Sequence, residues 1–554
     1  MTSVTTAVDR DEDRAADDAP DERTGSGTVN GTVDTPGTPG SHASTRPGHV
    51  RRRSHAVFAV FAVALGARLF GIRTAYNIFI DETTYTTIAH NLASGDGLTL
   101  FGQPFTLHPP VAFALLALFD RLTGSTGTPF DQQILMLRIL PAVFGAMVVA
   151  LGYAITARLA TGWVVPVVVA VLLAFNPFQV YFDSRVLLEP FAGCFVAASV
   201  LLLLRATSGA HARTARRRLT VVGAALTAGL AFASKETFGL VWAVTLLVLL
   251  ALPAVAPRAT VWRVLVGGAA VYAAIIAVVW SVYGPATWWA SHTSGLSRLV
   301  GTHQITGFNA ASTKVTFTER LVANLGPYAV TYVLLAAGTV AALVVLVRHR
   351  VWRRRPRTVG ERGVLVVALW TAAAAGYLAY ATAFGSIEEQ MYYIPLLPCT
   401  ITLALLWDRH ARSDGPRRAL RRALPAAVAL VTVAAVVVSA VVWVDQRRTD
   451  HNRYEQFLAW ARLNLQDGVT IAVADDPAQF LVQRAVIGRW ETPAAWRANG
   501  VDYVLVDSEL VRQGYSLMDA PTLRMLQDTA PVAFSTTADD STLYLFEVSA
   551  ETGR

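Results

Sequence analysis

Residues 138–157 read RILPAVFGAMVVALGYAITA, a run of twenty residues whose single charge, Arg138, stands at the first position. A helix of about twenty mainly apolar residues is long enough to cross the hydrocarbon core of a bilayer. Similar runs recur along the middle of the chain, and only 16% of its 554 residues are charged. A soluble domain usually carries about 25% charge. The sequence therefore predicts an α-helical polytopic membrane protein.

About eleven transmembrane helices are expected in total. The predicted spans are 55–73, 138–157, 162–180, 186–204, 219–234, 237–256, 262–283, 325–347, 363–384, 391–407 and 423–443. The apolar stretch 109–123 is too short to cross, and counting it would place the Arg-rich linkers outside, so we expect an interfacial or re-entrant helix there.

Arg-rich linkers set the expected orientation. Four of them lie on one side of the membrane by alternation, namely 205–218, 257–263, 348–362 and 408–422. The cluster Arg51–Arg53 before the first span belongs to the same side, which the positive-inside rule makes cytoplasmic. The net charge of +8 is therefore interpreted as a topology signal, with no nucleic acid as partner. An odd number of spans in a plasma membrane then leaves the C-terminus extracytoplasmic.

Three regions follow from composition. Residues 1–50, rich in Asp, Thr, Gly and Pro, are expected to form a disordered cytoplasmic tail. Residues 51–444 form the transmembrane domain, in which 74–137 is the first outer loop. Residues 445–554 are expected to form a small extracytoplasmic α/β domain. Its predicted strands are 469–474, 503–507 and 541–548, and its predicted helices are 477–484 and 494–499.

The first outer loop begins with the acidic pair Asp81-Glu82. Apolar residues follow at spacings of three and four from Tyr85 to Leu92, which predicts one buried face of a helix on the membrane surface. In a structural interpretation Asp81 is the N-cap of this helix, and Glu82 is a first-turn acid favoured by the helix dipole. In a functional interpretation the pair carries chemistry.

Further ionisable residues collect at the same outer face. Glu189 enters the outer end of an apolar span, where a charge is costly and often functional. The competing interpretation is an ion pair with Arg185 at i,i+4 spacing. Lys235 and Arg138 also stand at outer span ends, where snorkelling to the interface is the simpler explanation. His108 precedes a Pro-Pro pair as a polar anchor or a plain loop residue.

The order of these pieces resembles the C-type, lipid-phosphosugar-dependent glycosyltransferases, and most closely the protein O-mannosyltransferases and the lipid A aminoarabinose transferases. The resemblance covers about residues 56–443. It rests on Asp81-Glu82 with Tyr85, Pro109-Pro110, the run 137–141 (LRILP), Asn176-Pro177, Ser184-Arg185 to Glu189-Pro190, Lys235-Glu236 and the run 393–398 (YIPLLP). Two positions depart from the pattern, because His108 stands where the family often has Lys and Glu189 where it often has Asp.

The resemblance implies transfer of a sugar from a polyprenyl monophosphate donor to a glycan, lipid or protein acceptor on the outer face. By that likeness Asp81 is the general base, with Glu82 beside it to orient the acceptor. Arg138 and Lys235 would hold the donor phosphate. The acceptor or metal side would include Glu189, Arg185 and His108. The cofactor is unknown, and a divalent metal stays open.

Two other classes of function remain open from the sequence. A transporter or lipid flippase would show interrupted helices and charges near mid-bilayer. A membrane-anchored binding protein would carry its function in 445–554. The collection of ionisable residues at one face, without a visible internal repeat, favours the enzyme.

Overall fold

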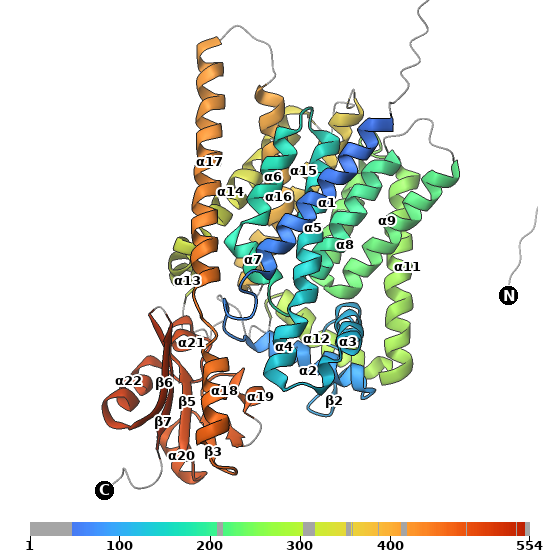
Figure 1. The fold of residues 1–554 in the computed structure, drawn as a ribbon. Helices are drawn as coiled ribbons and strands as arrows, with labels where there is room; N and C mark the ends of the chain where they lie inside the picture. Colours follow the sequence, from blue (N-terminus) through green and yellow to red (C-terminus); the bar gives the residue numbers. More distant parts are fainter. Residues whose placement is uncertain are drawn as a thin grey trace, which may run out of the picture. The chain divides into compact units, whose positions relative to one another are not determined.

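The computed structural model describes residues 47–207, 214–302, 316–350, 356, 358–385, 387–411, 418–482, 485–538 and 540–548. The predicted disordered tail 1–50 lies outside the described residues except for its last four. Most of the chain is helical (Figure 1). The helices are α1 (Pro47–Leu69), α2 (Ile80–Ser94), α3 (Val111–Thr123), α4 (Phe130–Leu137), α5 (Ile139–Leu159), α6 (Val164–Ala174), α7 (Pro177–Asp183), α8 (Glu189–Thr207), α9 (Thr214–Ser234), α10 (Glu236–Ala251), α11 (Arg258–Tyr283), α12 (Pro285–Leu299), α13 (Phe317–Ala323), α14 (Leu325–Arg348), α15 (Val359–Ala383), α16 (Tyr393–Ala411), α17 (Arg418–Arg448), α18 (Arg453–Asn464), α19 (Ala478–Leu481), α20 (Pro493–Ala498), α21 (Ser508–Gln513) and α22 (Ala520–Thr529), with 3-10 turns η1 (Ser125–Gly127) and η2 (Glu389–Tyr392).

Each segment predicted to span the membrane coincides with a helix or, in one case, with a pair of helices. Over the described part of the chain, seven helices are long and apolar enough to cross a bilayer, and the pair α6 and α7 makes an eighth if it is one span. Helix α1 over Ser54–Leu69 and helix α10 are apolar but shorter. The multi-pass helical membrane fold is thereby confirmed, whereas the number of eleven crossings stays a prediction.

The predicted span 162–180 is broken in the middle. Helices α6 and α7 meet at an angle of 61°. The cause is the Asn176-Pro177 step, because proline cannot donate the amide hydrogen bond that would continue α6. Asn176 instead caps the new helix, with its Oδ1 accepting from the backbone amide of Gln179 at 2.9 Å. This break turns the chain so that the residues after α7 reach the outer loop.

The stretch 109–123 forms α3, which has 13 residues and is too short to span a bilayer. Gly124, with φ of +69°, ends it in the left-handed conformation typical of a helix C-terminus. Phe113 and Leu116 on α3 are fully buried. Helices α2, α3 and α4 lie at the end of the bundle that carries the C-terminal strands (Figure 1).

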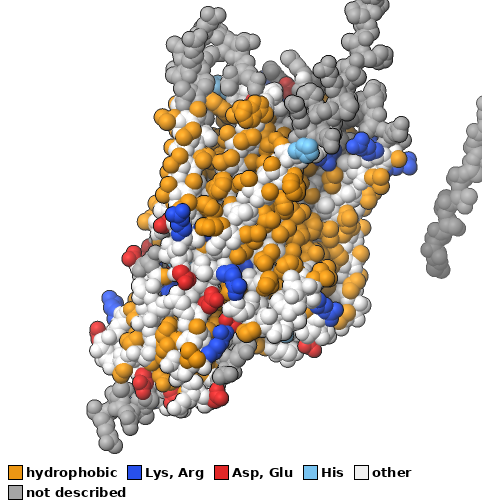
Figure 2. Space-filling model, in the orientation of Figure 1, with side chains coloured by type: hydrophobic (Ala, Val, Ile, Leu, Met, Phe, Trp, Pro, Cys, Tyr) orange, Lys and Arg blue, Asp and Glu red, His pale blue; other side chains and the backbone are white. Residues whose placement is uncertain are grey.

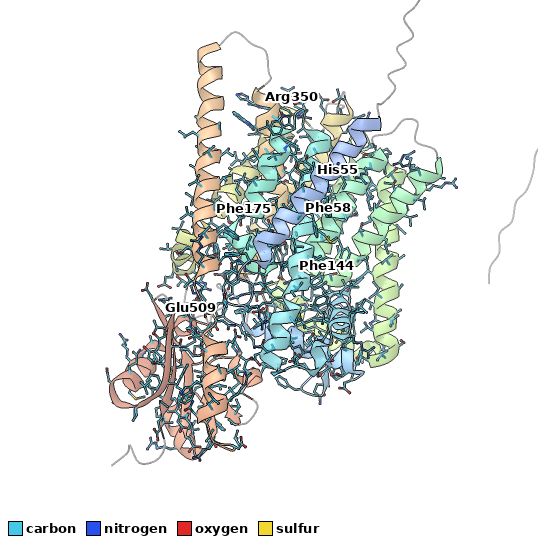
Figure 3. All side chains as sticks on the ribbon, viewed as in Figure 1. His55, Phe58, Phe144, Phe175, Arg350 and Glu509 are labelled. Carbon is cyan, nitrogen blue, oxygen red and sulfur yellow. The ribbon has the colours of Figure 1, made fainter. Side chains whose placement is uncertain are left out.

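The two ends of the bundle differ in character. Figure 2 shows a broad hydrophobic surface over the bundle, with Asp and Glu side chains mainly toward the C-terminal strands and Lys and Arg side chains at both ends. In Figure 3, His55 and Arg350 lie at one end of the bundle and Glu509 lies at the other. The predicted topology, including which end of the bundle faces the cytoplasm, stays a prediction.

The C-terminal residues build one five-stranded mixed sheet with strand order β4-β3-β5-β7-β6. Strands β3, β4 and β5 pair in parallel, and β5, β7 and β6 pair antiparallel. The strands are β3 (Thr470–Val473), β4 (Val486–Gly488), β5 (Tyr503–Asp507), β6 (Val532–Ala538) and β7 (Ser541–Glu547), besides a small outer hairpin of β1 (Thr99–Leu100) and β2 (Gln103–Pro104). The three strands and two helices expected here coincide with β3, β5, β7, α19 and α20.

The C-terminal sheet does not stand apart from the bundle. Residues 51–554 form one compact unit. Tyr454 and Phe457 on α18 belong to the same buried apolar core as the transmembrane helices. Helix α17 also runs on to Arg448, so a domain boundary at residue 444 stays a prediction.

Candidate active site

Helix α2 places the acidic pair at the end of the bundle that carries the C-terminal strands (Figure 1). Its N-cap is Phe79, in an extended conformation, so Asp81 is not the cap that the structural interpretation expected. Glu82, at the third helical position, does accept a hydrogen bond from the Phe79 amide at 3.2 Å, as an acid in a first turn often does. Because neighbours on a helix are about 100° apart, the two carboxylates point to different sides of α2.

Glu82 faces a group of arginines and is fully buried. Nε and one terminal nitrogen of Arg138 each donate to a Glu82 oxygen at 2.8 Å, which is the bidentate geometry of a strong ion pair. The backbone amide of Val186 adds a third hydrogen bond at 3.1 Å. Burial alone raises the pKa of Glu82, but the Arg138 charge and its hydrogen bonds outweigh burial and lower the pKa. Glu82 is therefore an ionised, fully engaged carboxylate.

Arg138 uses its whole guanidinium in this arrangement. Besides Glu82 it donates to the carbonyl oxygens of Ile72, Tyr76 and Asn77 at 3.1–3.4 Å. An arginine has five N–H donors, and these contacts occupy all five. The resemblance implies that Arg138 contacts a donor phosphate. Such a contact would require one of these five hydrogen bonds to be replaced. In this structure Arg138 ties the loop between α1 and α2 to the start of α5.

Arg185 lies on the same side, stacked against aromatic rings. Its guanidinium carbon is 4.0 Å from the centroid of the Tyr181 ring, and it donates to the Asn77 carbonyl at 3.1 Å. Its Nε is 4.0 Å from a Glu82 oxygen. Arg185 thus contacts Glu82 and not Glu189, so the predicted Arg185–Glu189 pair is wrong. We call Glu82, Arg138 and Arg185 the closed cluster.

A second buried ion pair lies within the bundle, and its acid, Asp183, is two residues before Arg185 of the closed cluster. Arg68 on α1 contacts Asp183 on α7 at 2.6 and 2.8 Å, and both side chains are fully buried. The Tyr393 hydroxyl donates to the other Asp183 oxygen at 2.6 Å. The sequence predicted no partner for Arg68 or for Tyr393, which belongs to the run 393–398, because a lone charge or a lone Tyr in an apolar run carries no pairing signal.

Asp81 occupies a different environment one residue earlier. Its side chain is partly exposed, and no hydrogen bond or ion pair of Asp81 occurs within the described ranges. Burial, followed by the negative charge of Glu388, raises the pKa of Asp81 to about 7, although Lys235 opposes the shift. A carboxylate that has a pKa near neutrality and no committed partner is suited to accept a proton.

Glu189 and Lys235 form an ion pair beside Asp81. Glu189 begins α8 and is 1% exposed, whereas Lys235 precedes α10 and is 12% exposed. Both act electrostatically on Asp81. One Glu189 oxygen accepts from Lys235, and the other is buried without a hydrogen-bond partner. We call Asp81, Glu189 and Lys235 the open cluster.

His108 borders the open cluster without adding a charge to it. Its ring lies edge-on to Tyr85, with centroids 5.9 Å apart. Burial, followed by the charge of Lys235, lowers the pKa of His108 to about 3. His108 is therefore neutral at physiological pH, unlike the lysine that the family often has before the Pro-Pro pair.

No group of three or more His, Cys, Asp or Glu within the described residues is arranged to hold a metal ion. Glu189 and Asp81 are the carboxylates nearest to such a role, and Glu189 is already paired with Lys235. Among the described residues nothing supports a metal site, and the cofactor stays unknown.

The fold is similar to solved structures of glycosyltransferases. ArnT from Cupriavidus metallidurans, crystallised with undecaprenyl phosphate, matches 92% of this chain and 99% of its own length, with a TM-score of 0.53 and 14% identity. Its apo form matches 90% of this chain and 98% of its own, with a TM-score of 0.52 and 13% identity. The apo oligosaccharyltransferase of Archaeoglobus fulgidus matches 90% of this chain and 74% of its own, with a TM-score of 0.51 and 13% identity.

Sequence comparison alone finds none of this similarity. No protein-family model matches the chain, and no curated protein matches it. At 13–14% identity the structural matches establish the fold, and they confirm at that level the resemblance drawn from the ordered motifs. The chain therefore has the membrane fold of the C-type glycosyltransferases.

Proposed function

We propose that this chain is a membrane glycosyltransferase that moves a sugar from a polyprenyl monophosphate donor to an acceptor at the outer face. The observation that carries the proposal is the free, partly exposed Asp81 carboxylate, whose pKa is about 7, beside Lys235. The shared fold adds support, since ArnT was crystallised with undecaprenyl phosphate.

The proposed reaction is a direct displacement with inversion. Asp81 takes the proton of an acceptor hydroxyl as the oxygen attacks the anomeric carbon of the donor. The bond between that carbon and the phosphate oxygen breaks, and both bonding electrons leave with the polyprenyl phosphate. The departing phosphate gains one negative charge, which the Lys235 ammonium is placed to stabilise.

Lys235 can bind the donor phosphate because its present partner, Glu189, is also a member of the open cluster. In its ion pair with Glu189 the Lys235 side chain remains 12% exposed, and the charge of Glu189 acts in turn on Asp81. A donor phosphate that displaces Glu189 from Lys235 would exchange one anion for another around the same cation. The acceptor would then lie on the Asp81 side, with neutral His108 at its border.

Glu82 and Arg138 receive a positioning role in this proposal. Their fully engaged contacts hold the start of α2, and with it Asp81, against α5. Arg185 holds the same loop through Asn77. Arg138 is therefore assigned to the structure around the base and Lys235 to the phosphate.

Asp81→Asn tests the proposal in reconstituted nanodiscs that contain labelled polyprenyl-phosphate sugars and a membrane extract as acceptor source. Because Asp81 has no hydrogen bond or ion pair to lose among the described residues, the variant should fold normally and lose sugar transfer by about 10²–10⁴-fold, as expected for a missing general base. Asp96→Asn, an exposed acid of the same outer loop, is the matched control and should keep full transfer.

Two results would contradict the proposal. Equal transfer by the Asp81→Asn variant and the wild type would remove the base assignment. Movement of an intact solute into sealed vesicles by the wild type, without sugar transfer from any donor, would establish a transporter in its place.

A further inference from the structure

The loop that delivers Asp81 to the site is held by residues almost four hundred positions away. Residues 70–79 join α1 to α2 without forming a longer helix or a strand. Two residues that follow α17 donate hydrogen bonds to backbone carbonyl groups of this loop. The His451 amide donates to the Thr74 carbonyl at 2.9 Å, and the Asn452 side chain donates to the Arg73 carbonyl at 3.1 Å.

The side chain of Asn77 connects the loop to the C-terminal residues through two hydrogen bonds. Its Nδ2 donates to the Asp507 carboxylate, at the end of β5, at 2.9 Å. Its Oδ1 accepts from the backbone amide of Tyr454, on α18, at 3.2 Å. A carboxamide supplies a donor and an acceptor at once, and this position uses both toward the same part of the chain.

The backbone of Asn77 faces the closed cluster at the same time. Its carbonyl oxygen accepts from Arg185 at 3.1 Å and from Arg138 at 3.4 Å. Arg138 in turn holds Glu82, the residue next to Asp81. Asn77 therefore links β5 and α18 to the arginines that fix the start of α2.

The partners of Asn77 on the C-terminal side are themselves rigidly placed. Asp507 is fully buried and also accepts from Arg453 at 2.9 Å. Its backbone amide donates to Asp475, which follows the neighbouring strand β3. A further contact reinforces the connection, since the ring of Tyr515 lies edge-on to that of Phe79, the N-cap of α2, with centroids 6.0 Å apart.

We propose that Asn77 is a positioning residue through which the C-terminal sheet holds Asp81 in place for catalysis. This inference rests on the proposed function of Asp81. It adds that residues of the C-terminal sheet contribute to catalysis by holding this loop, without contacting the reacting atoms themselves. A base displaced by about 1 Å costs roughly 10²-fold in rate, so a loosened loop should lower kcat. The KM for the donor should change little, because Lys235 is not on this loop.

The sharpest test exchanges the two side chains. Asn77→Asp places a second carboxylate against Asp507 and should lower kcat about 10–100-fold, with the donor KM changed less than about threefold. The double variant Asn77→Asp/Asp507→Asn restores one donor and one acceptor between the two positions and keeps their summed charge. It should recover at least about tenfold of the lost kcat. Asn499→Asp, exposed after α20, is the control and should behave as wild type.

Amide hydrogen exchange supplies a readout that does not depend on activity. Peptides covering residues 72–94 should exchange faster in the Asn77→Asp variant and return toward wild type in the double variant. An unchanged kcat in Asn77→Asp, or a double variant no better than the single one, would overturn the positioning role. If the wild type transfers no sugar at all, the proposed function fails and the catalytic role of Asn77 fails with it. Altered exchange would then show only that the contact is structural.

Discussion

The open and closed clusters differ sharply although Asp81 and Glu82 are adjacent in the chain. Glu82 is fully buried, and its two oxygens receive hydrogen bonds from Arg138, Val186 and Phe79. Asp81 is partly exposed, and its pKa is raised to about 7. Two carboxylates of nearly the same chemistry thus receive different environments, which suit Glu82 to an anchoring role and Asp81 to the proposed role of base. Asp81 can remain without a hydrogen-bond partner in the described structure because Glu82 makes the contacts that hold the start of α2.

Removal of the guanidinium from the closed cluster should have the largest effect on stability. Arg138→Met leaves Glu82 buried without its partner, and breaking a buried ion pair from one side costs about 3–5 kcal/mol. We expect a clear fall in the thermal unfolding temperature, followed by tryptophan fluorescence in detergent.

The matched comparison is Lys235→Met in the open cluster. Lys235 keeps 12% of its side chain exposed and donates one hydrogen bond to Glu189, whereas fully buried Arg138 donates two to Glu82, so the loss of stability should be smaller than for Arg138→Met. Replacing both members of the closed pair, as in Glu82→Met/Arg138→Met, should recover much of the lost stability. Equal losses for Arg138→Met and Lys235→Met would remove the distinction between the two clusters.

The buried Arg68–Asp183 pair that supports the closed cluster should be sensitive to added volume. A Cβ at Gly145 on α5 would overlap the carboxyl group of Asp183. Gly145→Ala should therefore destabilise the protein by about 1–3 kcal/mol, the usual cost of overpacking. Gly66→Ala on α1 is the control, since an added Cβ there meets no atom within 4 Å. The same unfolding measurement applies, and an unchanged Gly145→Ala variant would contradict the tight packing around Asp183.

The smallest expected effect is a shift of the pH profile set by the open cluster. The rate should fall as pH drops below about 7, because protonated Asp81 cannot accept the acceptor proton. Glu388→Gln removes a negative charge that raises the pKa of Asp81, so the acid limb should move to lower pH by a few tenths of a unit.

The neighbouring acid provides the control for this shift. Glu389 pairs with Arg320 and Asn324, and it is not among the charges that act most strongly on the pKa of Asp81. Transfer rates of the wild type, Glu388→Gln and Glu389→Gln between pH 5 and 9 would test whether Asp81 is the titrating base. A limb that moves equally in both variants, or in the opposite direction in Glu388→Gln, would show that Asp81 is not the titrating base.

Part of the candidate site was predictable from residue types and their places along the chain. The sequence placed Asp81, Glu189 and Lys235 at the outer ends of apolar segments, and the structure brings these three together. It could not choose the partner of Glu189, because i,i+4 spacing favoured Arg185 while the actual partner, Lys235, is 46 positions away. The link between Asn77 and Asp507 spans 430 positions and left no local signal.

The amino-acid sequence by itself determined that this protein is a helical membrane protein, and where its helices lie. These properties depend on the length and apolarity of single segments, and each segment carries that information alone. Only the tertiary structure decided which of two adjacent carboxylates is committed and which is free. That outcome depends on arginines and backbone groups from α1, α5 and the chain after α7, whose approach to α2 is set by the packing of the whole bundle.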